Sequence, residues 1–327
     1  MRIFITGAEG FIGRHTLIRL FADGHRLTAA IRSVQEEKRL QALGIETVRG
    51  NLNEEIELNA ALSGHDAVVH CAAYVSLWGS PAQFQETNIG LTKKLIEAAR
   101  TTGIKRFIHM STASVVLNER CALYDAQEQL PLCRSVEMLF AYSKAQAERI
   151  VISANTAQFA TVILRPAFVW GLGDLVDRQI GPAANQGKFG WFNQGEYLYS
   201  SCYVGNLCEA ICLALLSTAS AEAFFIADDE IMSFRAWMTQ RLQAGRYRVP
   251  TLSIHRAVAW PLARFTENGW NHLPLKGDPP LVREAVQTTA YPFTLSIKKA
   301  KRMLLYKPTH TIAAGMRAIA SPKGPQE

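Results

Sequence analysis

The chain has 327 residues, of which 48% are hydrophobic and 19% are charged, and its formal net charge is +7. This composition is too apolar for a disordered protein, and the length allows one large domain or two coupled ones. The positive excess lies in residues 228–327, which carry 15 basic and 7 acidic side chains. A solvated basic surface, an acidic substrate or partner, and an anionic membrane surface are all compatible with this charge. Nucleic acid is not expected, because no binding motif accompanies the charge.

Six cysteines are present, and no two of them form a C-x-x-C pair. We expect reduced thiols in a cytoplasmic protein and no metal site. The first residues are too short an apolar run for a signal peptide. The longest apolar stretch, residues 210–216, is too short to cross a bilayer. The sequence therefore predicts a protein without a transmembrane segment.

The first half of the chain alternates short β-rich runs with longer helical patterns. Strands are predicted at residues 2–6, 26–31, 45–48, 67–70, 106–110 and 161–164. Helices are predicted at residues 11–22, 34–43, 56–62, 86–101 and 138–154. Apolar strands that alternate with helices indicate a parallel sheet covered on both faces. With right-handed crossovers, this pattern predicts an α/β fold with a doubly wound parallel sheet of the Rossmann type.

The pattern changes after Arg165-Pro166. Residues 176–198 resist assignment, residues 206–216 are predicted as a helix and residues 223–226 as one more strand, and the rest is mostly helical. The predicted division has three parts. They are a sheet domain at residues 1–168 to which residues 199–227 return, a smaller, mostly helical C-terminal region at residues 169–198 and 228–322, and a frayed tail at residues 323–327.

A glycine-rich turn follows the first predicted strand and opens the first predicted helix. Glycine suits a tight turn at position 7, the close approach of a phosphate at position 10, and close packing of helix on strand at position 13. The start of the helix offers free N–H groups and a partial positive charge. A turn with only a packing role is the alternative. We predict that a dinucleotide binds here, at Gly7, Glu9, Gly10, Phe11, Ile12 and Gly13.

The end of the second predicted strand indicates which dinucleotide binds. A carboxylate there would favour NAD by binding the ribose hydroxyls, but this chain has Arg32 and Ser33 instead. Both residues could pair with a 2′-phosphate, so we expect NADP(H) rather than NAD(H). A solvent-facing Arg32 is the alternative. Asn51 and Leu52, which follow the third strand, are expected to border the adenine.

Several short motifs run in order through most of the chain, and together they resemble the extended short-chain dehydrogenase/reductase family, the NAD-dependent epimerase/dehydratase superfamily. Besides the glycine turn, they are His70-Cys71-Ala72-Ala73, Asn88, Ser111-Thr112, Ser143-Lys144, Arg165-Pro166 and Val169-Trp170-Gly171. Within that family the chain is most similar to the 3β-hydroxysteroid dehydrogenase/isomerase branch, through Gly187-Lys188-Phe189-Gly190, Tyr203-Val204-Gly205-Asn206 and Pro279-Pro280-Leu281-Val282-Arg283. The resemblance implies that five further residues lie against the cofactor, namely Cys71, Ala72, Ala73, Pro166 and Val169.

The resemblance also implies a catalytic set made of a Ser or Thr, a Tyr, and a Lys four residues after the Tyr on one helix face. Lys144 matches the lysine that holds the nicotinamide ribose. Thr112 matches the hydroxyl that orients the substrate oxygen, and Asn88 matches the residue that supports the lysine from below. The position four residues before Lys144 is Phe140. Phenylalanine cannot carry a proton, so this departure removes the usual proton donor of the family.

Other groups could supply that proton. Tyr74 follows the fourth predicted strand, although it could equally line a pocket wall. Tyr142 is two residues from Lys144 and therefore points roughly 200° away on an ideal helix. Three functions stay open: an NAD(P)H-dependent oxidoreductase of ketones or alcohols with an atypical active site, a cofactor-binding sensor or subunit without turnover, and a non-redox isomerase, lyase or epimerase.

Several segments indicate which molecules the protein could bind. Six aromatic side chains between residues 189 and 203 suit an apolar or planar small-molecule substrate, including a polycyclic or long-chain one, and core packing explains them equally well. Residues 255–270 combine tryptophans with arginines and could form a lid, a weak peripheral membrane contact or an internal helix. The resemblance implies a homodimer formed through the helices at residues 86–101 and 138–154.

Overall fold

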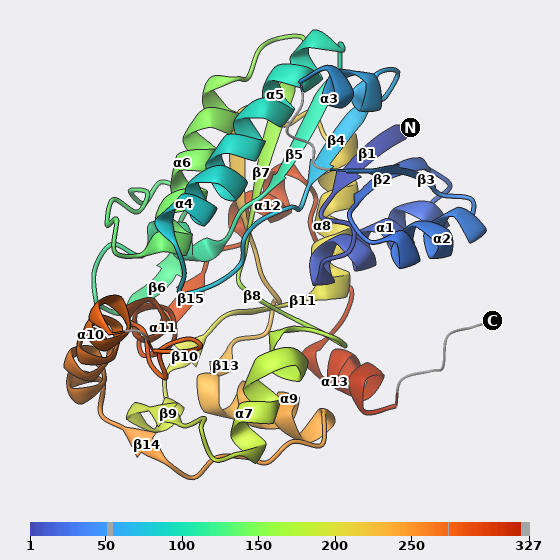
Figure 1. The fold of residues 1–327 in the computed structure, drawn as a ribbon. Helices are drawn as coiled ribbons and strands as arrows, with labels where there is room; N and C mark the ends of the chain where they lie inside the picture. Colours follow the sequence, from blue (N-terminus) through green and yellow to red (C-terminus); the bar gives the residue numbers. More distant parts are fainter. Residues whose placement is uncertain (51–54, 274, 322–327) are drawn as a thin grey trace.

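The computed structural model describes residues 1–50, 55–273 and 275–321, and its centre is a parallel sheet of seven strands (Figure 1). The strand order is β12-β7-β5-β4-β1-β2-β3. These strands are β1 (Arg2–Thr6), β2 (Arg26–Ile31), β3 (Glu46–Arg49), β4 (Ala67–His70), β5 (Arg106–Met110), β7 (Ala160–Pro166) and β12 (Glu222–Ile226). The predicted α/β class with a doubly wound parallel sheet is confirmed.

Helices cover both faces of this sheet, because successive side chains of a strand point to opposite faces. Ile3 and Ile5 of β1 belong to one buried cluster, and Phe4 between them belongs to the other. The first face carries α1 (Phe11–Ala22), α2 (Val34–Ala42) and α8 (Val204–Leu216). The second face carries α3 (Glu55–Leu62), α5 (Leu91–Thr101) and α6 (Leu139–Ser153).

The helix predicted at residues 86–101 begins earlier and is not regular. It opens with α4 (Pro81–Phe84), continues as the π-helical segment η1 (Gln85–Gly90), and ends as α5. Proline at the first helical position suits a helix start, because its missing N–H would be unpaired there in any case. A π-helical turn inside a longer helix often marks a functional site, and this one contains Asn88.

Most of the remaining elements form a second region below the carboxyl ends of the strands (Figure 1). Three small sheets lie there, of four, two and two strands. The strands are β6 (Leu123–Ala126), β8 (Phe168–Trp170), β9 (Trp191–Phe192), β10 (Leu198–Tyr199), β11 (Ser201–Tyr203), β13 (Met232–Ser233), β14 (Ser253–Ile254) and β15 (Phe293–Leu295). The short helices are η2 (Ala113–Val116), η3 (Val176–Ile180), α7 (Gly181–Asn185) and η4 (Asn193–Gly195).

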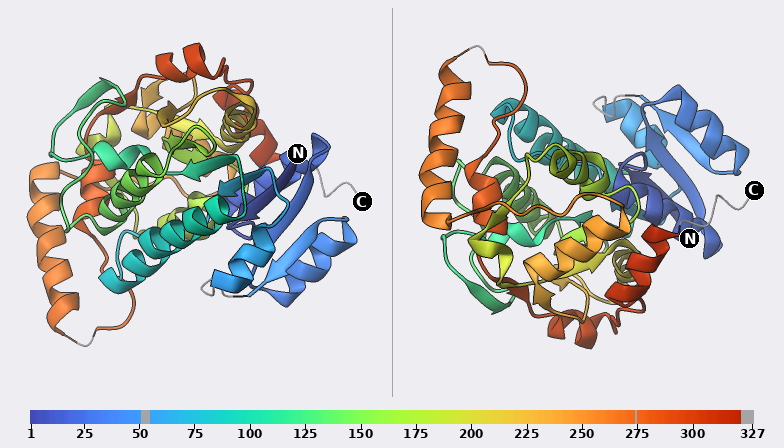
Figure 2. Two further views of the ribbon diagram at one scale, coloured as in Figure 1. Left: turned by 90° about the horizontal axis from the view of Figure 1, so that it is seen from above. Right: turned by 90° about the horizontal axis from the view of Figure 1, so that it is seen from below.

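Five helices follow in the C-terminal part, namely α9 (Phe234–Ala244), α10 (Arg256–His272), α11 (Arg283–Thr289), α12 (Lys298–Met303) and α13 (Ile312–Ala320). Both views of Figure 2 show α10 at the outer edge of the molecule. Among the described residues, no helix combines the length and hydrophobicity that crossing a membrane requires. The division into domains stays a prediction, and its tail at residues 323–327 lies outside the described residues.

The aromatic segment at residues 189–203 packs within the second region. Trp191 is buried and donates from its indole Nε1 to the carbonyl oxygen of Pro250, at 2.8 Å. The ring of Tyr197 stacks on Phe234, and the Tyr199 hydroxyl donates to a backbone carbonyl of α11. Of the two interpretations of this segment, the structure shows core packing for these three side chains.

Candidate active site

The glycine turn lies between β1 and α1 and packs directly against the end of β4. Gly7 has a φ of +72°, and a Cβ atom there would come within 2.6 Å of the Ala72 nitrogen. A Cβ atom on Gly13 would collide with the carbonyl oxygen of Gly7. The chain therefore needs glycine at both positions, one for its backbone conformation and the other for close packing.

The start of α1 has the donors that a pyrophosphate needs. Gly10 is the residue before the helix and, having no side chain, cannot cap it. Gly10 is also exposed, and its own N–H donates to Gly7 O at 2.9 Å. The first-turn N–H groups, beginning at Phe11 and Ile12, therefore carry no side-chain cap at the positive end of the helix. These residues fit the phosphates of a dinucleotide.

At the end of β2, Glu9 of the glycine turn meets Arg32 and Ser33. The Glu9 carboxylate accepts the backbone N–H groups of Arg32 at 3.2 Å and of Ser33 at 2.8 Å. The Arg32 guanidinium is 3.9 Å from the same carboxylate, and its side chain is 91% exposed. A carboxylate therefore lies at the end of β2 although the strand itself contains none there, which sequence inspection missed.

The other predicted cofactor residues occupy the carboxyl edge of the sheet or the segment after it. Cys71 and Ala72 follow β4, and their backbone N–H groups donate to the backbone and side-chain oxygens of Thr6, at 3.1 and 3.3 Å. Burial raises the pKa of the Cys71 thiol to about 12, so the thiol stays neutral. Ala73 comes next along this edge. Pro166 is the last residue of β7, and Val169 lies on β8. Asn51 and Leu52 lie outside the described residues.

Lys144 projects from α6 into a buried polar site. Its side chain is fully enclosed, and Nζ lies 3.3 Å from Nε2 of His109 on β5. Burial lowers the pKa of Lys144 to about 8, while the charge of Glu148 opposes this shift. Burial and the nearby ammonium hold the pKa of His109 far below its usual range. His109 is therefore neutral and accepts a hydrogen bond from the lysine.

Glu148, one turn after Lys144, ties α6 to two strand ends. Its buried carboxylate pairs with Arg165 of β7 at 2.7 Å and accepts a hydrogen bond from the Ser111 hydroxyl, just after β5. Both partners of the ion pair are almost completely buried, so the pair is well defined geometrically. This contact holds Lys144 in register with the end of β5, where Thr112 follows.

Asn88 sits in the π-helical segment, and all of its polar atoms are used. Its Nδ2 donates to the Ser143 hydroxyl at 2.9 Å and to the Tyr74 carbonyl oxygen at 3.2 Å. Its Oδ1 accepts the Tyr74 N–H at 2.7 Å. Asn88 therefore supports the residue next to Lys144 and binds a backbone carbonyl.

A buried chain of hydrogen bonds continues from Asn88 toward the glycine turn. The Thr92 hydroxyl donates to the Asn88 carbonyl oxygen and lies 2.9 Å from Nε2 of His70. Nδ1 of His70 lies 2.7 Å from the hydroxyl of Thr6, the last residue of β1. Sequence reasoning missed the roles of His70 and His109. The available signal was a histidine within the last two residues of β4 and of β5, next to apolar strand residues.

The side chains of Thr112 and Tyr74 contact residues close to them in the sequence. The Thr112 hydroxyl caps η2, accepting the Ser114 N–H at 3.3 Å and sharing a hydrogen bond with the Ser114 hydroxyl at 3.1 Å. The Tyr74 ring packs edge-on against Phe84, and its hydroxyl lies beside Gly79. Neither hydroxyl makes a hydrogen bond to Lys144 in the described part of the chain.

Phe140 lies in the first turn of α6, and a carboxylate from a distant helix caps that turn. The N–H groups of Phe140 and Ala141 donate to the two oxygens of Glu284 on α11, at 3.1 and 2.8 Å. Burial raises the pKa of Glu284 to about 7, although both hydrogen bonds favour the charged form. Sequence inspection missed Glu284, because its partner is 144 residues away.

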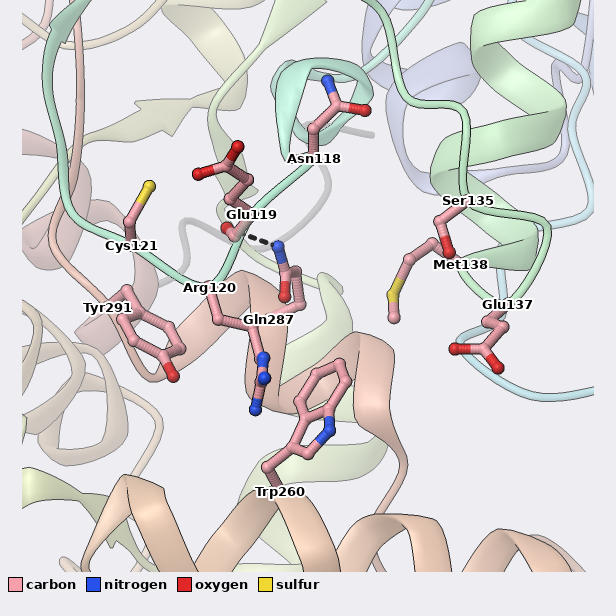
Figure 3. Close-up of a pocket in the computed structure, with 10 residues that line it drawn as sticks. All are labelled: Asn118, Glu119, Arg120, Cys121, Ser135, Glu137, Met138, Trp260, Gln287 and Tyr291. Atoms are coloured by element: carbon pink, nitrogen blue, oxygen red, sulfur yellow. Dashed lines mark hydrogen bonds between the residues drawn. The ribbon is translucent and has the colours of Figure 1, made fainter.

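A pocket of about 450 Å³ lies beside the start of α6, between the loop after η2 and helices α10 and α11 (Figure 3). The Arg120 guanidinium lies 4.5 Å from the centroid of the Trp260 ring on its floor. Gln287 of α11 donates to the Glu119 carbonyl oxygen and links the two sides. Met138, two residues before Phe140, lines the same pocket. The pocket therefore adjoins the helix that carries Lys144.

Comparisons with known proteins place the chain in a family. The sequence pattern of the 3-beta hydroxysteroid dehydrogenase/isomerase family matches residues 4–247. A ketoreductase of 4-hydroxy-2-methyl-3-oxo-4-farnesyl-3,4-dihydroquinoline-1-oxide from Stigmatella aurantiaca is 33% identical over 99% of this chain and 98% of its own. A 2-alkyl-3-oxoalkanoate reductase from Stenotrophomonas maltophilia is 32% identical over 98% of both chains.

The fold is also found in solved structures. UDP-glucuronic acid 4-epimerase from Bacillus cereus, in complex with NAD, superimposes with a TM-score of 0.71 at 21% identity over 97% of each chain. At this identity the likeness shows the fold alone. The family match and the two similar reductases confirm the predicted branch. The chain belongs to the 3β-hydroxysteroid dehydrogenase/isomerase family of extended short-chain dehydrogenases/reductases, and it is a nicotinamide-dependent oxidoreductase.

Proposed function

We propose that the protein is an NADPH-dependent ketoreductase of apolar small molecules that carry a carbonyl group. The observation that carries the proposal is the enclosed ammonium of Lys144, held by His109 and supported through Asn88 at the sheet edge beside the glycine turn. Two ketone reductases similar over nearly the whole chain support it, and both act on molecules with an alkyl or farnesyl part. The substrate is therefore proposed to be apolar, with a long-chain or cyclic body.

Each residue of the site has a role in this proposal. The first-turn N–H groups of α1 bind phosphate, and Lys144 holds the ribose next to the reacting ring. A bound nicotinamide dinucleotide supplies the hydride. Thr112 orients the carbonyl oxygen of the substrate once its hydroxyl turns away from Ser114. Phe140 fills the space of the usual tyrosine without donating a proton, so the proton comes from a water molecule or from the Thr112 hydroxyl.

NADPH is proposed over NADH because Arg32 is free to turn toward a 2′-phosphate. Its side chain is 91% exposed, and the ion pair with Glu9 is long. Replacing Arg32 with Asp should weaken NADPH binding far more than NADH binding in calorimetry. Equal losses for the two cofactors would contradict this choice.

A homodimer in the cytoplasm is proposed as the working form. Helices α5 and α6 lie side by side on one face of the sheet, with exposed charged residues on their outer sides, such as Lys93 and Arg149. All six cysteines are free, which suits a reducing compartment. Sedimentation of the purified chain would test the dimer.

The activity is tested with purified protein and a 2-alkyl-3-oxoalkanoate as the probe. We expect NADPH absorbance to fall and a hydroxy acid to form, and Lys144→Met should abolish both. Binding of NADPH without turnover of this probe, or of a range of apolar ketones, would support the second candidate, a cofactor-binding sensor or subunit. The residue that favours that candidate is Phe140.

A further inference from the structure

The carboxylate of Glu9 occupies two backbone donors that lie just before α2. Ser33 is the residue before this helix, and the N–H groups of Arg32 and Ser33 both point at Glu9. Backbone donors at the positive end of a helix bind anions well. In this structure the chain's own anion holds them.

Glu9 also forms an ion pair with the side chain of Arg32. The guanidinium lies 3.9 Å from the Glu9 carboxylate, which is only 24% exposed, while the arginine is almost fully exposed. Glu9 therefore partly neutralises Arg32, the cation at the end of β2 that was assigned to a 2′-phosphate. A negative charge here also repels an added phosphate directly.

We propose that Glu9 is a specificity-determining residue, which sets how strongly the protein distinguishes NADPH from NADH. Its carboxylate competes with a 2′-phosphate for the N–H groups of Arg32 and Ser33, and it does not compete with a ribose 2′-hydroxyl, which can donate to it instead. Glu9 weakens NADPH binding and favours NADH, against the pull of Arg32. This inference rests on the proposed binding of a nicotinamide dinucleotide.

The sequence position explains why this effect is hidden. Glu9 belongs to the glycine turn, 23 residues before Arg32, whereas a specificity carboxylate is sought at the end of the second strand. The turn after β1 and the end of β2 lie next to each other because these strands are adjacent in the sheet. The charge therefore reaches the same place from a different element.

Calorimetric titration of Glu9→Gln with each cofactor tests the inference. Removing the charge should tighten NADPH binding about tenfold and leave NADH binding unchanged or weaker. Glu37→Gln is the matched control, because Glu37 lies nearby on α2 and its carboxylate pairs with Arg49 at 3.0 Å. Its hydrogen bond to Ser33 is made by the backbone N–H, which the substitution keeps. This control should leave the ratio of the two dissociation constants at its wild-type value.

The results distinguish a failure of the proposed role of Glu9 from a failure of the proposed cofactor binding. An equal change for both cofactors, or the same change in Glu37→Gln, would overturn the role of Glu9 and leave cofactor binding intact. If the unaltered protein bound neither cofactor, the proposed function would fail instead. Glu9→Ser lacks the charge but keeps a small polar side chain, and it should shift the ratio of the two dissociation constants in the same direction. It replaces Glu9→Gln in the test if that variant does not fold.

Discussion

Nζ of Lys144 lies 3.3 Å from Nε2 of His109, and the protein encloses both side chains completely. An ammonium without a carboxylate in direct contact loses much of its stabilisation when water is removed, which is why its pKa falls. The neutral histidine compensates as a hydrogen-bond acceptor. The arrangement leaves a lysine whose charge state changes close to physiological pH.

The first prediction concerns the pH profile. Because the pKa of Lys144 is lowered to about 8, its positive charge is present below pH 8 and is lost as the pH rises through that value. We expect kcat/KM to fall about tenfold per pH unit above 8. Arginine keeps its charge to much higher pH, so any residual activity of Lys144→Arg should not show this fall in kcat/KM above pH 8. The same fall in kcat/KM in both proteins would mean that a group other than Lys144 loses its proton there.

The second prediction concerns the missing proton donor. Phe140→Tyr places a hydroxyl four residues before Lys144, on the same helix face. We expect reduction of simple ketones to rise by about 10²-fold or more, since general acid catalysis contributes roughly 10²–10⁴-fold. Tyr142→Phe removes a hydroxyl from the same helix and should leave activity unchanged. A fall in activity for Phe140→Tyr would mean that the phenylalanine serves a different chemistry.

The third prediction separates support of the site from support of the fold. Asn88→Ala leaves Tyr74 and Ser143 without their buried partner and should cost about 2–3 kcal/mol of unfolding free energy. Asn206→Ala is the control, because Asn206 is equally buried and bonds to Asp228 and His310 in the C-terminal part. Denaturant unfolding should show similar losses in both variants. Only Asn88→Ala should lower kcat, and equal kcat values would reduce Asn88 to a structural role.

The fourth prediction concerns Glu284, whose pKa rises from an ordinary 4.5 to about 7 in the folded protein. Between these values the folded protein keeps a proton that the unfolded chain releases, so this contribution to stability is present at low pH and lost as the pH rises through 7. The unfolding free energy should therefore drop by on the order of 2 kcal/mol from pH 5 to pH 8. Glu284→Gln should lack this part of the dependence.

The control for this measurement is Glu137→Gln. Glu137 is an exposed carboxylate that pairs with Arg283 near the same helix start. Its replacement should keep the pH dependence of the unaltered protein. An unchanged dependence in Glu284→Gln would show that Glu284 is ionised throughout this range.

Sequence reasoning located most of the strands and helices of the central sheet within one or two residues. It was least successful for the short strand β6, between β5 and α6, and after residue 166, where the strands of the small sheets escaped notice. Most of these strands have only two or three residues, which is too few positions for a periodic pattern. Their pairing partners also lie far away in the chain, as with β6 and β15.

The sequence by itself determined the doubly wound sheet, the glycine turn, and the relation between Phe140 and Lys144. These features depend on neighbours within one element, where periodicity and turn chemistry act directly. Only the tertiary structure decided that Glu284 caps the helix of Phe140, that His109 holds Lys144, and that Glu9 reaches Ser33. Each of these contacts joins side chains from different elements, and which atoms meet depends on how the packed elements bring their ends together.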